Sequence, residues 1–277
     1  MRYLLPLLLL AVAARAELKP DIEFAKAGGT NLTLDAFVPE GSGPFPTCIL
    51  VHGGGFTKGD KTSFIKPLFE PLSKAGFAWF SINYRLAPQH RYPANIEDVE
   101  SAIRWVKAHA AEYKADPKRI ALIGESAGGH LVSLAGVRAK ADTRVAAVVP
   151  IYAPHDLELR VRQSKTIPAW VEALFGLTEL NDAAWKVLRE ASPMTRVRKG
   201  MPPFLLIHGT KDDKVPFEQS LKFQEKMKAA GNVCDLIVVE GGIHGMGGWE
   251  KIDPSYKEKL VAWLHKTLAA KPSVQRP

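Results

Sequence analysis

The most constraining feature of this sequence is an apolar run that passes through a serine into a helix-like segment without any spacer. The run Ile120–Ile123 is typical of a fully buried strand, and the residues from Leu131 onward suit a helix. Between them, Gly124 and Gly128 lie two residues on either side of Ser126. Such a junction needs an abrupt reversal of the backbone, with no side chains where strand and helix approach. The pattern G-x-S-x-G therefore predicts a nucleophile elbow, although an ordinary glycine-rich turn can carry the same letters.

The rest of the chain alternates apolar strand-like runs with amphipathic helix-like segments. Strands are expected at 31–38, 48–51, 77–83, 120–123, 145–151, 204–207 and 236–239, and helices at 93–109 and about 253–268. Buried strands separated by helices predict an α/β fold with a mostly parallel central sheet and helices on both faces. A length of 277 residues suits one large α/β domain or two small ones, and a single domain is expected over residues 17–277. The turn at 39–44 has a composition typical of a hairpin.

One connection breaks this alternation. The interval from about 156 to 200 is longer than an ordinary loop and contains helix-like pieces at 169–175 and 182–190. Because most connections have about five residues, an insertion of this length is often functional. We interpret it as a small lid or pocket wall. The alternative is that the segment has a structural role alone.

The N-terminus has the composition of an export signal. Met1 and Arg2 are followed by an apolar run at 3–13 and by the small-residue end Ala14-Arg15-Ala16. A basic start, a short apolar run and an A-x-A end are typical of a cleavable signal peptide, so we expect residues 1–16 to be removed. The run is too short to span a bilayer, which takes about 20 apolar residues. The protein is therefore expected in the periplasm or outside the cell.

Composition excludes some partners and leaves others open. The formal net charge is +8, but the basic residues are scattered along the chain and no nucleic-acid motif accompanies them. A solvated surface is the simpler interpretation, and attraction to an acidic polymer is the alternative. The two cysteines, Cys48 and Cys234, lie in apolar runs and are expected to be unpaired. No metal-ligand motif is present, so no metal or other cofactor is expected, and the oligomeric state stays open.

Chemistry is expected where the strands end, because ligands of such sheets bind at the carboxyl ends of the strands. The strand at 48–51 is followed by His52 and by three consecutive glycines, Gly53 to Gly55. Glycines leave their backbone N–H groups open to close approach by a ligand. N–H groups of this kind stabilise the oxyanion that forms when a serine attacks an ester, and losing one donor costs about 3–4 kcal/mol. A flexible turn is the alternative interpretation.

A general base and an acid follow Ser126 in the sequence. His244 lies just beyond the strand at 236–239, in a glycine-rich loop, and Asp212 and Asp213 lie just beyond the strand at 204–207. The order serine, acid, histidine is that of the α/β hydrolases. Position alone does not choose between the two acids.

Three other histidines compete with His244 for the role of base. His130 lies one turn along the helix after the serine, where its ring would point away from the hydroxyl. His52 and His208 are more simply explained as side chains that hold loop backbones in place. We therefore take His244 as the candidate base.

The segments HGGGF, GESAGGH, HGTKDDKVPFEQS and GGIHG together resemble the α/β-hydrolase esterases, and in particular the bacterial bifunctional acetyl-xylan and feruloyl esterases. The resemblance extends from about residue 31 to 268. Its pattern H-G-x-x-D-x-x-V-P selects Asp212 as the acid and makes Asp213 an exposed neighbour. It also implies oxyanion donors at Gly54, Gly55 and Ala127.

These residues together predict an exported serine carboxylesterase that cleaves short-acyl or aromatic-acyl esters through an acyl-enzyme, with acetyl or feruloyl groups on plant polysaccharide as the candidates. Two alternatives remain open at this stage. The same fold supports amide hydrolases such as peptidases and arylformamidases, and it also supports noncatalytic binding modules. Such modules typically lose the serine or the histidine, and this chain retains both.

Overall fold

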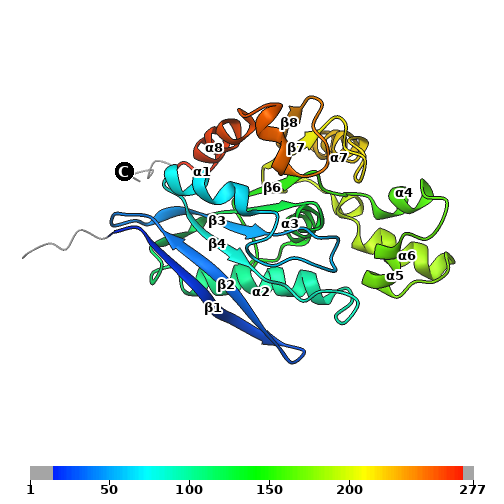
Figure 1. Ribbon diagram of the computed structural model, residues 1–277, viewed down its shortest axis with the longest axis horizontal. Helices are drawn as coiled ribbons and strands as arrows, with labels where there is room; N and C mark the ends of the chain where they lie inside the picture. The colour runs from blue at the N-terminus through cyan, green and yellow to red at the C-terminus, as the bar shows by residue number, and fades with distance from the viewer. Residues whose placement is uncertain (1–14, 271–277) are drawn as a thin grey trace, which may run out of the picture.

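A computed structural model describes residues 15–270, and its centre is one eight-stranded sheet (Figure 1). The strand order is β1-β2-β4-β3-β5-β6-β7-β8. Neighbours from β4 to β8 run parallel, whereas β2 is antiparallel to both β1 and β4. The strands are β1 Glu17–Ala27, β2 Thr30–Val38, β3 Phe45–Val51, β4 Ala78–Ile82, β5 Ala115–Glu125, β6 Ala147–Ile151, β7 Phe204–Gly209 and β8 Cys234–Val239. The predicted mostly parallel sheet is confirmed.

Helices cover both faces of the sheet and bury a separate apolar cluster on each. Figure 1 shows α1 (Phe69–Lys74) and α8 (Tyr256–Thr267) above the sheet and α2 (Ala94–Ala108) below it. The cluster beneath α1 and α8 includes Trp249 and Leu264, and the opposite cluster packs α2 together with α3 (Ala127–Arg138) and α7 (Glu218–Ala229). Since central strands such as β4 and β6 are buried along their whole length, both faces contribute to stability.

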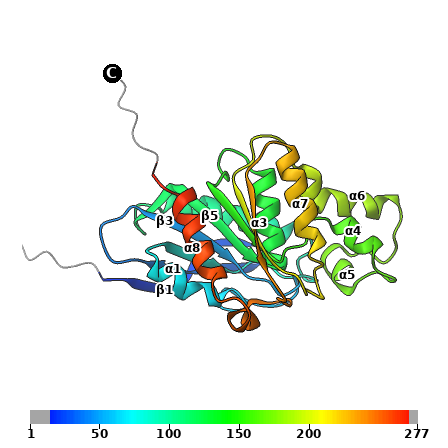
Figure 2. The same ribbon diagram turned by 90° about the horizontal axis from the view of Figure 1, so that it is seen from above.

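The expected insertion between β6 and β7 folds into three short helices at one end of the molecule (Figure 2). They are α4 (Leu157–Arg162), α5 (Ala169–Phe175) and α6 (Asp182–Ala191). Asp156 and Asn181 cap α4 and α6 by accepting hydrogen bonds from backbone amides. The three helices share a small apolar cluster of their own, made of Leu157, Val161, Val171, Leu188 and Ala191.

Some expectations from the sequence need correction or fall outside the structure. The turn at 39–44 is not a hairpin, because β4 lies between β2 and β3 in the sheet. Strand β1 and helix α7 were not expected. Residues 1–14 of the expected signal peptide lie outside the described residues. Cys48 in β3 and Cys234 in β8 are buried free thiols, and burial raises the pKa of both. Within residues 15–270, no helix has the length and apolar character needed to cross a bilayer.

Candidate active site

The segment around Ser126 has the backbone geometry that its glycines predict. Ser126 has φ 52° and ψ −116°, in a region that residues with a side chain seldom occupy. It joins the end of β5 directly to the start of α3. A Cβ atom on Gly124 would lie 2.4 Å from the Gly128 carbonyl oxygen, and one on Gly128 would lie 2.2 Å from the Val51 carbonyl oxygen. Both positions therefore need glycine so that the strand and the helix can approach each other. The turn places the serine hydroxyl at the carboxyl end of the central strand β5.

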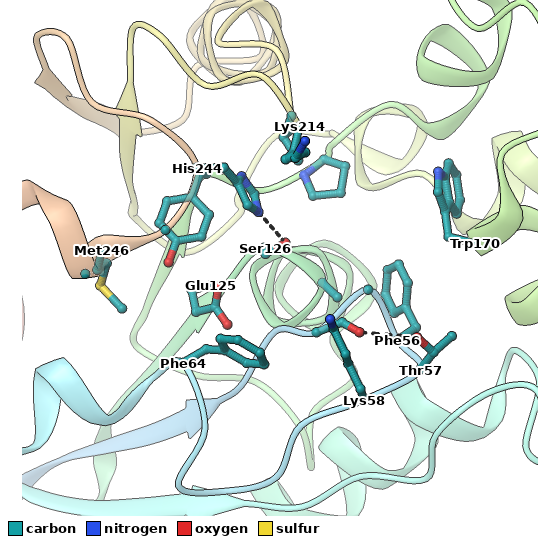
Figure 3. A pocket seen from close by; sticks show the side chains of 18 of the residues that line it. Phe56, Thr57, Lys58, Phe64, Glu125, Ser126, Trp170, Lys214, His244 and Met246 are labelled. Carbon is teal, nitrogen blue, oxygen red and sulfur yellow. Dashed lines mark hydrogen bonds between the residues drawn. The ribbon is translucent and has the colours of Figure 1, made fainter.

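Two loops from neighbouring strands bring a histidine and an acid to this serine. His244 follows β8, and its Nε2 atom lies 3.0 Å from Ser126 Oγ, a contact that Figure 3 marks with a dashed line. Asp212 follows β7, and its Oδ2 atom lies 2.7 Å from the Nδ1 atom of His244. With Nδ1–H donated to the carboxylate, the lone pair of Nε2 faces the serine hydroxyl. The residues that the sequence placed on three separate strand ends thus form one continuous hydrogen-bonded chain.

Asp212 is held as an anion by its surroundings. Its carboxylate is fully buried, and burial alone would raise its pKa, but hydrogen bonds from His208, His244 and the Val215 amide outweigh that effect and lower the pKa. Its Oδ1 atom also accepts the Lys214 amide at 2.9 Å. The neighbouring Asp213 is exposed and pairs with Lys214 at 3.0 Å. Of the two acids, only Asp212 contacts His244.

Two of the three rival histidines, His130 and His52, have partners outside the Ser126–His244–Asp212 chain. His130 is buried and its Nδ1 lies 2.9 Å from the Pro154 carbonyl, while His52 bonds the Gly53 carbonyl and stacks on Tyr84. Burial lowers the pKa of both to about 4. They therefore stay neutral near pH 7 and support loops.

His208 holds its loop backbone, as the sequence predicted, and it also makes one contact that the sequence did not predict. Its Nδ1 accepts the Ser220 hydroxyl at 2.7 Å, and its Nε2–H is shared between the Val215 carbonyl at 2.9 Å and Asp212 Oδ2 at 3.3 Å. The ring thus fixes the loop that carries Asp212 and contacts the carboxylate itself. A buried histidine at the end of a strand was the only sequence signal for this contact.

The glycine loop after β3 lies across the pocket from His244. Gly54 has φ 99° and Gly55 has φ 62°, backbone conformations that favour glycine. Within residues 15–270, the backbone N–H groups of Gly54, Gly55 and Ala127 donate to no other backbone or side-chain group. All three residues line the same pocket as Ser126. Unpaired N–H groups beside a serine hydroxyl meet one requirement of an oxyanion site.

The pocket has a volume of about 920 Å³. One wall comes from the glycine loop and the segment after it, including Phe56, Phe64 and Pro67, and the other comes from helix α5 through Ala169, Trp170 and Ala173. Figure 3 shows Trp170 and Met246 on opposite sides of Ser126. The size falls within the range of sites for small organic ligands, and the insertion forms part of the wall.

A comparison with known protein families identifies the family of this chain. Residues 34–227 match the family described as BD-FAE, a range that includes Ser126 and Asp212 and ends before His244. The chain belongs to the BD-FAE family. Its fold is that of the α/β-hydrolase esterases.

Relatives of this BD-FAE chain carry esterase names. It is 37% identical over 216 residues to esterase LipC of Mycobacterium tuberculosis, which covers 73% of this chain and 53% of LipC. It is 27% identical to an acetylxylan esterase of Xylanibacter ruminicola, covering 96% of this chain and 54% of that protein. The chain thus spans about half the length of these curated relatives. A solved structure, a truncated carbohydrate esterase from gut microbiota, superposes with a TM-score of 0.80 at 26% identity, covering 94% of this chain and 99% of that one.

One functional candidate in this BD-FAE chain was missed from the sequence. Glu125, directly before Ser126, is 3% exposed, lines the pocket and accepts a hydrogen bond from the Gly53 amide. Burial raises its pKa to about 7, opposed in part by hydrogen bonds from the Tyr152 hydroxyl and the Gly53 amide. Glu125 thereby links the nucleophile elbow to the glycine loop. The only signal in the sequence was a charged residue at the first variable position of G-x-S-x-G.

Proposed function

We propose that the protein is a serine carboxylesterase in which Ser126 is the nucleophile, His244 the general base and Asp212 the orienting acid. The observation that carries this proposal is the hydrogen-bonded chain of 3.0 Å and 2.7 Å contacts through the two nitrogens of His244. Acyl transfer also needs donors that stabilise the oxyanion. The unpaired N–H groups of Gly54, Gly55 and Ala127 line the same pocket and can serve as these donors.

The reaction follows from these positions. His244 Nε2 removes the proton of Ser126 as Oγ attacks the ester carbonyl, and the resulting oxyanion accepts hydrogen bonds from the three N–H groups. Asp212 stabilises the imidazolium that forms. The alcohol then leaves with the proton from His244, and an acyl group remains on Ser126. Water, deprotonated by the same ring, releases the acid and restores the serine.

For the substrate, we infer short-acyl or aromatic-acyl esters, with acetyl or feruloyl groups on plant polysaccharide as the specific candidates. The acetylxylan esterase relative and the carbohydrate esterase neighbour support this choice. Export through removal of residues 1–16, leaving a domain at 17–277, is part of the same proposal, because polysaccharide lies outside the cell. The basis for export is the composition of the N-terminus.

The decisive test is Ser126→Ala assayed with p-nitrophenyl acetate. We expect kcat to fall by at least about 10⁴-fold, as for other serine hydrolases that lose the nucleophile, while circular dichroism and Tm stay unchanged. A fluorophosphonate should label the wild-type protein at Ser126 and leave the variant unlabelled. Substantial retained hydrolysis by the variant contradicts the assignment.

The same experiments separate the other candidate functions. A folded wild-type protein that neither hydrolyses esters nor reacts with the fluorophosphonate would be a binding module. An amide hydrolase would be labelled at Ser126 but would cleave anilides or formamides faster than the matched esters. Assays of acetylated xylan, methyl ferulate and p-nitrophenyl esters side by side then define the acyl group.

A further inference from the structure

Basic side chains converge on the pocket although basic residues are scattered in the sequence. The pocket wall contains four of them, Lys58, Lys66, Arg160 and Lys214. Among residues 15–270 the wall contains one acidic residue, Glu125, whose pKa of about 7 leaves it only partly charged near neutrality. The Asp212 carboxylate is fully buried and is not part of the wall. The lining therefore carries an excess of positive charge.

Arg160, in the last turn of α4, is the most enclosed of these cations. It is half-buried, its guanidinium carbon lies 5.3 Å from the centre of the Trp170 ring, and its Nη2 donates to the Lys214 carbonyl at 2.8 Å. Within residues 15–270 it forms no ion pair with an acidic side chain. Burial lowers its pKa, and the charge of Asp212 opposes that effect. A guanidinium has five N–H donors, so most of them are left for a ligand.

The other three cations of the pocket wall are lysines. Figure 3 shows Lys58 and Lys214 on opposite sides of the Ser126–His244 pair, with the Lys58 nitrogen turned toward the middle of the pocket. Lys214 pairs with Asp213 at 3.0 Å, whereas Lys58 and Lys66 form no ion pair within the part of the chain that the structure describes. Charges of one sign around a concave site add to a potential that concentrates ligands of the opposite sign.

We propose that the preferred ester carries a carboxylate in addition to its scissile bond, and that Arg160 is the main ligand of that carboxylate. This inference rests on the proposed esterase function and names the substrate class of the same site. A guanidinium that lies over an aromatic ring keeps an edge free for two parallel N–H···O bonds, which is the geometry that a carboxylate accepts. The carboxylate belongs either to the acyl part, as in a dicarboxylic half-ester, or to the alcohol part, as in an acetylated uronic acid.

Two matched pairs of substrates distinguish these sources. The acyl pair is p-nitrophenyl hexanoate and the p-nitrophenyl half-ester of adipic acid, which have equal chain length. The alcohol pair is acetylated methyl xyloside and acetylated methyl glucuronoside. We expect wild-type kcat/KM to favour the anionic member of one pair by about tenfold, the contribution of one hydrogen bond to a charged group. The pair that shows the preference identifies the part of the ester that carries the carboxylate.

Variants then test the role of Arg160. Arg160→Gln should lower the anionic-to-neutral ratio of kcat/KM about tenfold, and Arg160→Lys should retain part of it. Lys226→Gln, a matched loss of charge at an exposed position on α7 away from the pocket, should leave the ratio unchanged. If Arg160→Gln does not fold, Lys58→Gln in the exposed loop serves instead, with an expected fall of about threefold.

Each result has one meaning. Hydrolysis of the neutral esters with no preference in either pair overturns the inference and leaves the esterase proposal intact. A preference that survives in both Arg160 variants overturns the assignment to Arg160. Failure to hydrolyse any of the four esters, together with no fluorophosphonate label on Ser126, overturns the proposed function itself.

Discussion

The central sheet buries its strands between helices on both faces, whereas the α4–α6 insertion buries five apolar side chains in a cluster of its own. The groups proposed for the reaction all follow strands of the sheet or begin α3. The insertion contributes Arg160, Ala169, Trp170 and Ala173 to the pocket wall. The difference teaches that the reacting groups depend on the sheet, whereas the wall that faces the ester rests partly on the insertion's own cluster and partly on the main core, in which Leu174 of α5 is buried. Changes confined to the insertion's own cluster should therefore disturb the reacting groups less than changes within the sheet.

The two adjacent acids after β7 give the largest expected effect within the sheet region. Asp212→Asn should reduce kcat about 10³–10⁴-fold, because an amide in that position favours the wrong tautomer of His244. Asp213→Asn should change kcat for a neutral ester less than about twofold, since its side chain is exposed and pairs with the exposed Lys214. Steady-state kinetics on p-nitrophenyl acetate compares them directly. A more damaging Asp213→Asn would transfer the role to that residue.

Core truncations test whether the two regions are separately supported. Leu206, in β7, and Leu188, in α6, are both fully buried. Leu206→Ala should lower the free energy of global unfolding by about 2–5 kcal/mol. Leu188→Ala should increase amide hydrogen exchange within α4–α6 and shift the global transition less, because a small satellite cluster can open locally. Equal global losses with unchanged exchange in α4–α6 would mean that the two regions unfold as one unit.

Glu125→Gln tests the link between the elbow and the glycine loop through pH. The carboxyl has its pKa raised from an ordinary 4.5 to about 7, so the folded protein holds a proton that the unfolded chain releases between those values. The Glu125 contribution to the free energy of unfolding should therefore fall as pH rises from 4.5 to 7, while the buried His52 and His130, whose pKa values are lowered, contribute an opposite slope in both proteins. The variant should remove the Glu125 slope, with a difference on the order of 1 kcal/mol or more across the window. Urea denaturation at several pH values measures it, and parallel curves for both proteins would contradict the prediction.

The smallest effect is expected from the insertion's aromatic wall. Trp170→Ala removes apolar pocket surface without touching a group that takes part in proton transfer. KM for p-nitrophenyl esters should rise about three- to tenfold, consistent with losing part of a buried aromatic contact, while kcat changes less than about twofold. A large fall in kcat with unchanged KM would mean that the insertion positions the reacting groups, and the comparison between the two regions would then fail.

The central part of the fold was readable from the sequence because it rests on local patterns. Continuous apolar runs mark the buried strands β3 to β7, and the glycines around Ser126 report an approach that leaves no room for a Cβ atom. The same logic placed Asp212 and His244 at strand ends. Their contact distances depend on how neighbouring strands pair, which local patterns do not contain.

Other elements could not be predicted from the sequence, and the structure shows the physical reason in each case. Strand β1 is mostly exposed and contains a proline and two register irregularities, so it lacks a clean alternation. The turn at 39–44 looked like a hairpin because β4, which separates the strands around it, comes much later in the chain. Glu125 and Arg160 are ordinary charged residues in the sequence, and their surroundings exist only once distant segments have folded together.

The two buried thiols have a practical consequence for observing the insertion at work. Cys48 and Cys234 are shielded inside strands, and their raised pKa values disfavour the reactive thiolate. A cysteine introduced on the exposed side of α5 or α6 should therefore take up a maleimide dye or a nitroxide selectively, with both native thiols left in place. Spectroscopy on such a conjugate would report whether the pocket wall moves when an ester enters.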